Sequence, residues 1–222
     1  MTGETGDGAF AQALSGLKRR GSGLLVVGAA RHEAHLGACR RLLGDASEHR
    51  RRLVVLTDSV PGGEARTDAD AGPGLRVIDR RPTTRSAAAS ERSGIGTAPN
   101  DLRTLRRETL AAVEASDAEA EGLAPAELRV CLDSLRPLLD VYDERAVREF
   151  VRAVVEATRE VGGMCHVHLP AEGDSAAVDS VADLFDATVE VRTVRWDGDE
   201  APDIEQRWRL HDPEVATDWL PL

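Results

Sequence analysis

GLLVVGAARHEAHLGACRRLLG, the stretch from Gly23 to Gly44, decides how the rest of the chain is interpreted. An apolar strand ends at Gly28, a short loop follows, and a helix is predicted over about Arg31–Leu43, with Gly44 as its stop. This order of strand, glycine loop and helix is typical of a phosphate-binding unit in an α/β protein.

The residues that hold phosphate in such a loop are missing here. The P-loop pattern G-x-x-x-x-G-K-[ST] requires glycine, lysine and a hydroxyl residue at fixed distances from Gly28, and those positions hold Glu33, Ala34 and His35. A carboxylate 4–6 Å from a phosphate repels it by a few kcal/mol, at an effective dielectric constant of about 20. The chain therefore has the frame of a nucleotide site without its phosphate contacts.

The remaining elements follow a regular order of strands and helices. Apolar runs predict strands at 24–28, 53–57, 75–79, 128–133 and 164–169. Helices are predicted at 101–120, 144–161 and 175–184, and a short helix or turn at 9–20. The alternating segments within 188–211 predict a hairpin, whereas 81–99 lack any period and predict a mobile loop. The pattern favours one three-layer α/β domain over 1–222, with a mainly parallel sheet and a C-terminal antiparallel hairpin.

The composition indicates in which kind of cellular compartment this protein works. It has 39 acidic and 28 basic residues, a net charge of -11, and Lys18 as its only lysine. Such a balance fits a salt-rich cytoplasm, where carboxylates keep surfaces soluble, although a GC-rich genome would also favour arginine. No apolar run approaches the ~20 residues of a membrane span, and the N-terminus does not resemble a signal peptide. A cytoplasmic protein without a membrane partner is expected.

The charge is divided unevenly along the chain. Residues 1–107 are net positive, whereas residues 108–222 carry the acidic excess. The division reflects either two ordinary faces of one domain or a polar molecule suited to end-to-end contact. It predicts a protein partner or a homo-oligomer.

Two segments carry a resemblance to a known family. LSGLKRRGSGLLVVG, Leu14–Gly28, resembles the opening of KaiC-like members of the RecA superfamily. LRVCLDSLRPLLD, Leu128–Asp140, resembles their Walker B strand, with four apolar positions and then Asp-Ser-Leu. The order of elements over about Phe10–Leu210 is also similar, and the chain looks like the degenerate RecA-like proteins of haloarchaea. The resemblance implies a RecA-like domain in which strand 24–28 lies beside strand 128–133.

The same resemblance implies where a nucleotide would bind. The degenerate site would consist of Gly28, Arg31, His32 and Asp133. The segment TDSVPGGEA after the second strand lacks the acidic pair that supplies the catalytic base in KaiC-like enzymes. An alternative role for Asp133 is to cap the next turn through the amides of Ser134 and Leu135. No catalytic residue, enzymatic activity or cofactor is expected.

Several functions remain open at this point. The first hypothesis is a non-catalytic RecA- or KaiC-like domain that acts as a regulatory or scaffolding protein, for instance in signalling. The second is a nucleotide-binding protein with an altered P-loop and weak or no hydrolysis. The third is a DNA-associated factor that uses the arginines of 76–107, although these have no interleaved aromatic residues, so nucleic acid is not the expected partner. A receiver-like domain with Asp58 at a strand end is the fourth.

Cysteine and histidine residues give a weaker signal. Cys39, Cys131 and Cys165 are odd in number and lack zinc-type spacing, so neither a disulfide framework nor a metal finger is indicated. On a strand, His166 and His168 share one face and Cys165 points the other way. Two histidines can share a zinc ion, but no third ligand is visible nearby, so no metal site is predicted. The tryptophans at 196, 208 and 219 are expected to pack against the hairpin and hold the C-terminal tail.

Overall fold

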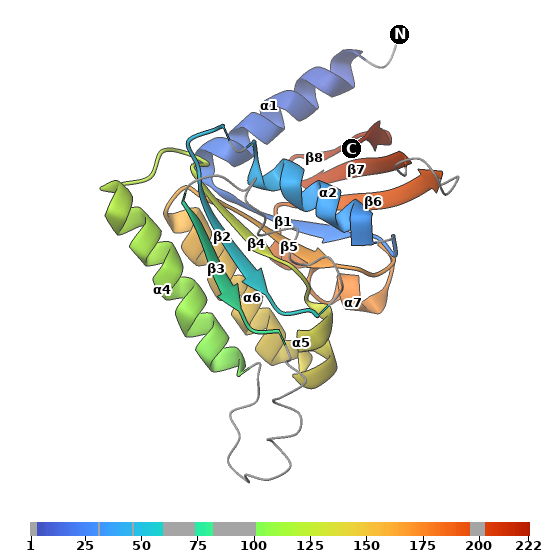
Figure 1. Cartoon of the computed structure of the whole chain (residues 1–222). Helices are drawn as coiled ribbons and strands as arrows, with labels where there is room; N and C mark the ends of the chain where they lie inside the picture. Colours follow the sequence, from blue (N-terminus) through green and yellow to red (C-terminus); the bar gives the residue numbers. More distant parts are fainter. Residues whose placement is uncertain (1–3, 31, 46, 60–73, 82–100, 196–202) are drawn as a thin grey trace.

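A single mixed sheet runs through the middle of the molecule (Figure 1). The computed structural model describes residues 4–30, 32–45, 47–59, 74–81, 101–195 and 203–222. Within these residues the strand order is β3-β2-β4-β5-β1-β6-β7-β8, and β9 pairs with β7. The strands are β1 (Ser22–Val27), β2 (Arg51–Leu56), β3 (Leu75–Asp79), β4 (Leu128–Leu132), β5 (Met164–Leu169), β6 (Ala187–Arg195), β7 (Asp203–His211), β8 (Glu214–Ala216) and β9 (Leu220–Pro221).

Strand direction changes only toward the C-terminus. All neighbouring pairs from β3 to β6 are parallel, and β7 pairs antiparallel with β6, β8 and β9. The predicted mainly parallel sheet and C-terminal hairpin are therefore confirmed. The two short strands β8 and β9 were not predicted, because each is too short to show a period.

The prediction that β1 lies beside β4 is wrong. Strand β5 lies between them and pairs in parallel with both. All six residues of β5 are buried, as expected for a strand with a parallel neighbour on each side. Both β1 and β4 nevertheless lie in the interior of the same sheet.

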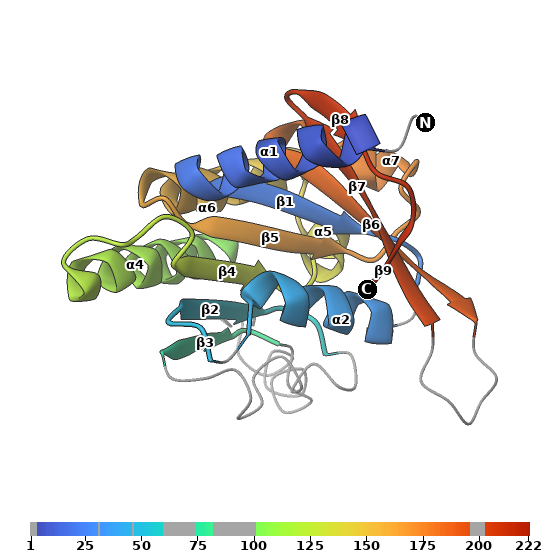
Figure 2. The same cartoon turned by 90° about the horizontal axis from the view of Figure 1, so that it is seen from above.

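Helices cover both faces of the sheet, as predicted (Figure 2). On one face lie α4 (Leu102–Ala120), α5 (Arg136–Val141) and α6 (Glu144–Glu160). On the other lie α1 (Glu4–Arg20) and α2 (His32–Leu43). Alternate residues of β1 divide between these layers: Leu25 and Val27 face α6, while Leu24 and Val26 face α2.

Some boundaries differ from those predicted. Helix α1 is longer than the 9–20 segment, and α5, which has a proline in its first turn, was not predicted. The predicted helix 175–184 is divided into α7 (Ala176–Asp179) and a 3-10 turn at Ala182–Leu184. The predicted loop 81–99 lies outside the described residues, apart from Arg81.

Helix α6 is the most regular amphipathic element. Its buried face consists of Val147, Phe150, Val151, Val154, Val155 and Thr158. Asp143 caps its first turn, because Oδ1 accepts a hydrogen bond from the backbone N–H of Ala146 at 2.9 Å. Helix α6, which packs against β5, therefore begins directly after its capping residue, Asp143.

Removing that cap gives a first test of the fold. Asp143→Ala should lower the free energy of unfolding by about 1 kcal/mol, because an orphan N–H of the first turn loses its acceptor. Urea denaturation followed by circular dichroism measures the change. Asp140→Ala, at an exposed position of the neighbouring α5, is the matched control and should alter stability by less than ~0.5 kcal/mol. Equal effects from the two variants would contradict the capping role.

Candidate functional site

The loop after β1 is built around Gly28. This glycine has φ 132°, and a Cβ added to it would lie 2.1 Å from the carbonyl oxygen of Val191 in β6. Its N–H donates to the carbonyl of Ala171 at 2.8 Å. The glycine is thus required for the close passage of β1 against β6, whether or not a ligand binds.

The residues that replace the P-loop lysine and hydroxyl point into the protein. Ala34 is buried in the core between α2 and the sheet. His35 is also buried, and its Nε2 lies 2.9 Å from the carbonyl oxygen of Gly28, while its Nδ1 lies 3.1 Å from Nδ1 of His168. The imidazole therefore connects the glycine loop to β5.

The other loop residues of the predicted site are placed differently. Arg31 lies outside the described residues. His32 is partly buried, and its buried Nε2 has no hydrogen-bond partner among the described residues. Glu33 is exposed in the first turn of α2. The structure thus places its negative charge at the helix N-terminus, where a phosphate would also have to lie.

Asp133, at the end of β4, is buried and hydrogen-bonded to the loop after β2. Its Oδ1 accepts bonds from the backbone N–H and the hydroxyl of Thr57, at 2.7 and 2.8 Å, and Oδ2 accepts from the N–H of Asp58 at 3.4 Å. The expected cap of the following turn is incorrect for Leu135, whose N–H donates to the carbonyl of His168. The carboxylate instead ties neighbouring strands together at their carboxyl ends.

A cavity of about 390 Å³ lies beside Gly28 and is partly acidic. Glu172 and Glu190 line it, together with Arg192 and Trp219. Arg192 forms an ion pair with Glu205 at 2.7 Å and stacks on Trp219, 3.9 Å from the ring centroid. The cation at this cavity is therefore already engaged by a carboxylate and an aromatic ring.

Trp219 supports the predicted role of the tryptophans. Arg207, which pairs with Glu190, also lies over its ring, 4.8 Å from the centroid. Trp208 is buried and meets Phe10 of α1 edge to face, at 5.9 Å between centroids. Trp219 packs against the hairpin, as expected, and Trp208, a residue of β7, packs on α1; Trp196 lies outside the described residues.

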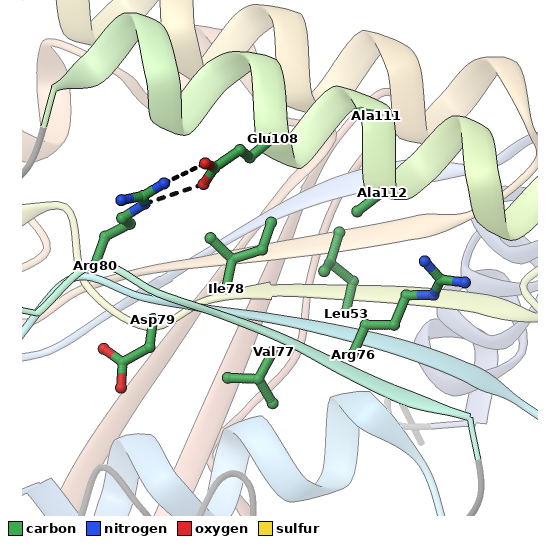
Figure 3. Close-up of a pocket in the computed structure, with 9 residues that line it drawn as sticks. All are labelled: Leu53, Arg76, Val77, Ile78, Asp79, Arg80, Glu108, Ala111 and Ala112. Carbon is green, nitrogen blue, oxygen red and sulfur yellow. Dashed lines mark hydrogen bonds and ion pairs between the residues drawn. The ribbon is translucent and has the colours of Figure 1, made fainter.

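A second groove, of about 620 Å³, lies at the edge of the sheet formed by β3, between β3 and α4. Figure 3 shows Arg80, just after β3, reaching across it to Glu108 of α4; Arg80 Nε donates to Glu108 Oε2 at 3.0 Å. Ile78 and Ala112 contribute apolar side chains to its lining. This groove contains none of the residues of the predicted nucleotide site.

Three arginines at the start of the predicted basic stretch, in or just after β3, are paired with carboxylates. Arg76 and Arg80 bind Glu119 and Glu108 of α4, and Arg81 binds Asp79. Each guanidinium is thus partly neutralised by a carboxylate of the same fold. This arrangement gives no support to a phosphate-binding surface on β3.

Between α2 and the sheet, four potential metal ligands converge. Cys39 comes from α2, Cys131 from β4, and His166 and His168 from β5, and one ligand atom from each lies within 4.8 Å of the others. Cys39 Sγ and Cys131 Sγ are 3.2 Å apart, and neither cysteine forms a disulfide. All four side chains are buried.

Register and helical spacing explain this convergence. Cys131 and His166 are direct partners in the parallel pair β4–β5, and His168 follows two residues later on the same face. Cys39 is four residues after His35, so both project from the inner face of α2. Cys165 faces the opposite core, as the sequence predicted.

The pKa of the buried cysteine thiol differs between the two sides of the sheet. Burial alone would raise the pKa of Cys39, but its contacts with Cys131, His166 and His168 outweigh this and lower the pKa well below its usual range. For Cys165, burial raises the pKa to about 12. The lowered pKa favours the thiolate form of Cys39, whereas the raised pKa favours the thiol form of Cys165.

Residues 21–191 match the profile of a family of unknown function, DUF7504. This chain belongs to the DUF7504 family. A search of curated proteins gave no match.

The DUF7504 region contains most of the features described above. It begins just before β1 and ends within β6, so it includes Gly28, Asp133 and the four clustered side chains. Strands β7, β8 and β9 lie beyond it. Among the described residues, no helix is long and apolar enough to cross a membrane.

Sequence analysis missed the two cysteine members of the cluster. It found His166 and His168 and lacked a third ligand, because Cys39 and Cys131 are 92 residues apart and join the histidines only through the strand order. The available signal was the inward position of each: Cys39 shares a helix face with His35, and Cys131 lies in the apolar strand that ends at Asp133.

Proposed function

We propose that this DUF7504 protein is a non-catalytic RecA- or KaiC-like domain that works as a regulatory or scaffolding protein in a salt-rich cytoplasm. The observation that carries the proposal is the position of Asp133. Its carboxylate, the one acidic group retained from a Walker B strand, is buried and bonded to Thr57 and Asp58. A group held in this way supports the sheet and is poorly placed to hold Mg²⁺.

The glycine loop supports the same conclusion. Ala34 and His35 pack inward, so no lysine or hydroxyl reaches toward a phosphate at those positions. The neighbouring cavity presents Glu172 and Glu190, and the pairing of Arg192 with Glu205 occupies a nearby cation. A polyphosphate would meet repulsion here without the charge-assisted bonds that normally offset its desolvation.

The working surface of such a protein would be one that binds another protein or a second copy of the chain. The charge division between residues 1–107 and 108–222 favours this kind of contact. The carboxylate pairing of Arg76, Arg80 and Arg81, in or just after β3, disfavours DNA as a partner at this edge of the sheet. Weak nucleotide binding without hydrolysis is the competing function, and the following measurement separates the two.

The expected result is no ATPase or GTPase activity and no saturable binding of Mg²⁺-ATP with a dissociation constant below about 1 mM, equivalent to ~4 kcal/mol of binding free energy. Isothermal titration calorimetry measures the binding. It is run in concentrated potassium chloride because an acidic, salt-adapted chain needs counter-ions to remain folded. Circular dichroism of the same sample shows that the protein is folded.

A micromolar dissociation constant would overturn the proposal, provided that it weakens in Asp133→Asn. Asparagine keeps an acceptor oxygen for Thr57 and removes the charge that Mg²⁺ requires. Asp58→Asn, on the adjoining loop, is the matched control, because it removes a carboxylate that does not belong to the Walker B strand. That outcome would make the protein a nucleotide sensor with a rebuilt loop.

A further inference from the structure

We propose that Cys39, Cys131, His166 and His168 form a structural zinc site between α2 and the sheet. The four donors come from three separate elements and lie within 4.8 Å of one another. This site is independent of the nucleotide question and concerns how the helix after the glycine loop is held.

The donor set is the one that zinc prefers. Two thiolates and two imidazoles are a common tetrahedral combination, with Zn–S of about 2.3 Å and Zn–N of about 2.0–2.1 Å. Those bond lengths place neighbouring ligand atoms about 3.3–3.8 Å apart. Cys39 and Cys131, at 3.2 Å between sulfurs, need to open slightly, and the longest separation needs to close by about 1 Å.

Burial argues for a closed, structural site. Cys39, Cys131 and His168 are 0% exposed and His166 is 2% exposed. Four protein ligands and no solvent contact leave no open position for a substrate, which distinguishes structural from catalytic zinc. The ion would fasten α2 to β4 and β5.

His166 supplies an independent observation. Its Nε2 is buried and has no hydrogen-bond partner among the described residues. A buried imidazole nitrogen without a partner is costly in a folded protein, and a metal ion would satisfy it. The apolar neighbours of the cluster, Leu43, Val54 and Leu56, offer no alternative acceptor or donor through their side chains.

His35 orients the second histidine. The carbonyl of Gly28 can only accept a hydrogen bond, so Nε2 of a neutral His35 is the donor and Nδ1 is the acceptor. Nδ1 of His168, 3.1 Å away, then carries a proton and donates it to His35. A neutral His168 is left with the lone pair on Nε2, which is the form that binds a metal.

The first experiment measures metal in the intact protein. Full-length protein is produced in zinc-supplemented medium, dialysed against metal-free potassium chloride buffer and analysed by mass spectrometry of its metals. About one zinc ion per chain is expected, as for other sites with four protein ligands. Folded protein that is metal-free and takes up no zinc on titration would overturn the proposal. So would loss of the Cys39 and Cys131 thiols to a disulfide in that sample.

Cobalt gives a readout that does not depend on any variant. Replacing zinc with Co²⁺ should produce the visible bands of a tetrahedral ion and the near-ultraviolet charge transfer of cobalt–thiolate bonds. Added zinc should abolish both. The pale spectrum of octahedral cobalt with oxygen ligands would contradict the assignment, because it would place the ion on surface carboxylates.

Variants then locate the ion. Cys131→Ser and His166→Asn should each weaken cobalt binding by at least about tenfold, because each removes a ligand. Cys165→Ala, in the same strand but facing the other core, should leave binding unchanged. His35→Ala should weaken binding by about 10–100-fold, as expected for a residue that orients a ligand. Full cobalt bands in Cys131→Ser, or their loss in folded Cys165→Ala, would overturn the proposal.

Discussion

Gly28→Ala should destabilise the protein by about 4 kcal/mol, the combined cost of overpacking and of a side chain at φ 132°. The new Cβ would lie 2.1 Å from the carbonyl oxygen of Val191, and this neighbour is backbone of a central strand pair that cannot move aside. Urea denaturation monitored by circular dichroism measures the effect.

A matched control separates this clash from a general effect of replacing glycine. Gly8→Ala lies in α1, where an added Cβ meets nothing within 4 Å, and should stabilise the helix by up to about 1 kcal/mol. If Gly28→Ala were as stable as the wild type, the close contact between β1 and β6 would be wrong. The glycine would then have to be explained by a ligand.

Asp133→Ala is expected to have the second-largest effect, a loss of about 3 kcal/mol in the free energy of unfolding. Alanine leaves the buried N–H of Thr57 without the carboxylate oxygen that now accepts its hydrogen bond at 2.7 Å. Hydrogen bonds to a charged group contribute about 1.5–3 kcal/mol each, and the abandoned donor adds its desolvation cost. Thermal and urea unfolding of the purified variant provide the measurement.

Asp133→Asn tests whether the acceptor or the charge matters. It should lose only about 1 kcal/mol, because one amide oxygen can still accept from Thr57. A residue kept for metal-nucleotide binding behaves differently, since removing it usually leaves stability unchanged or improved. Equal or greater stability of Asp133→Ala would therefore favour a retained ligand-binding role over the structural one.

The fold followed from the sequence wherever a segment was long and periodic. The helix predicted at 144–161 and the strands predicted at 24–28 and 128–133 were located to within one or two residues. Strand order was less accessible, because pairing is a non-local property. No local pattern shows that β5 separates β1 from β4.

The candidate sites were harder to predict than the fold, because most of their contacts join residues far apart in the sequence. Loss of the P-loop residues was visible at Glu33, Ala34 and His35 because a motif has fixed spacing. The contact between Asp133 and Thr57, and the meeting of two distant cysteines with a pair of histidines, depend on which strands are neighbours. A site that forms between residues of different strands can be recognised only once the order of the strands in the sheet is known.

The sheet also partitions the interior, with consequences for how substitutions combine. One packed layer lies between the sheet and helices α4 and α6 and contains Phe150 and Val154 of α6. The other lies between the sheet and helices α1 and α2 and contains Leu24 of β1 and Ala38 of α2. Free-energy changes at sites without shared neighbours usually sum, whereas changes at touching sites couple. Protein engineers can therefore redesign the α6 layer and the α2 layer as separate modules, and effects measured in one layer carry over to variants of the other.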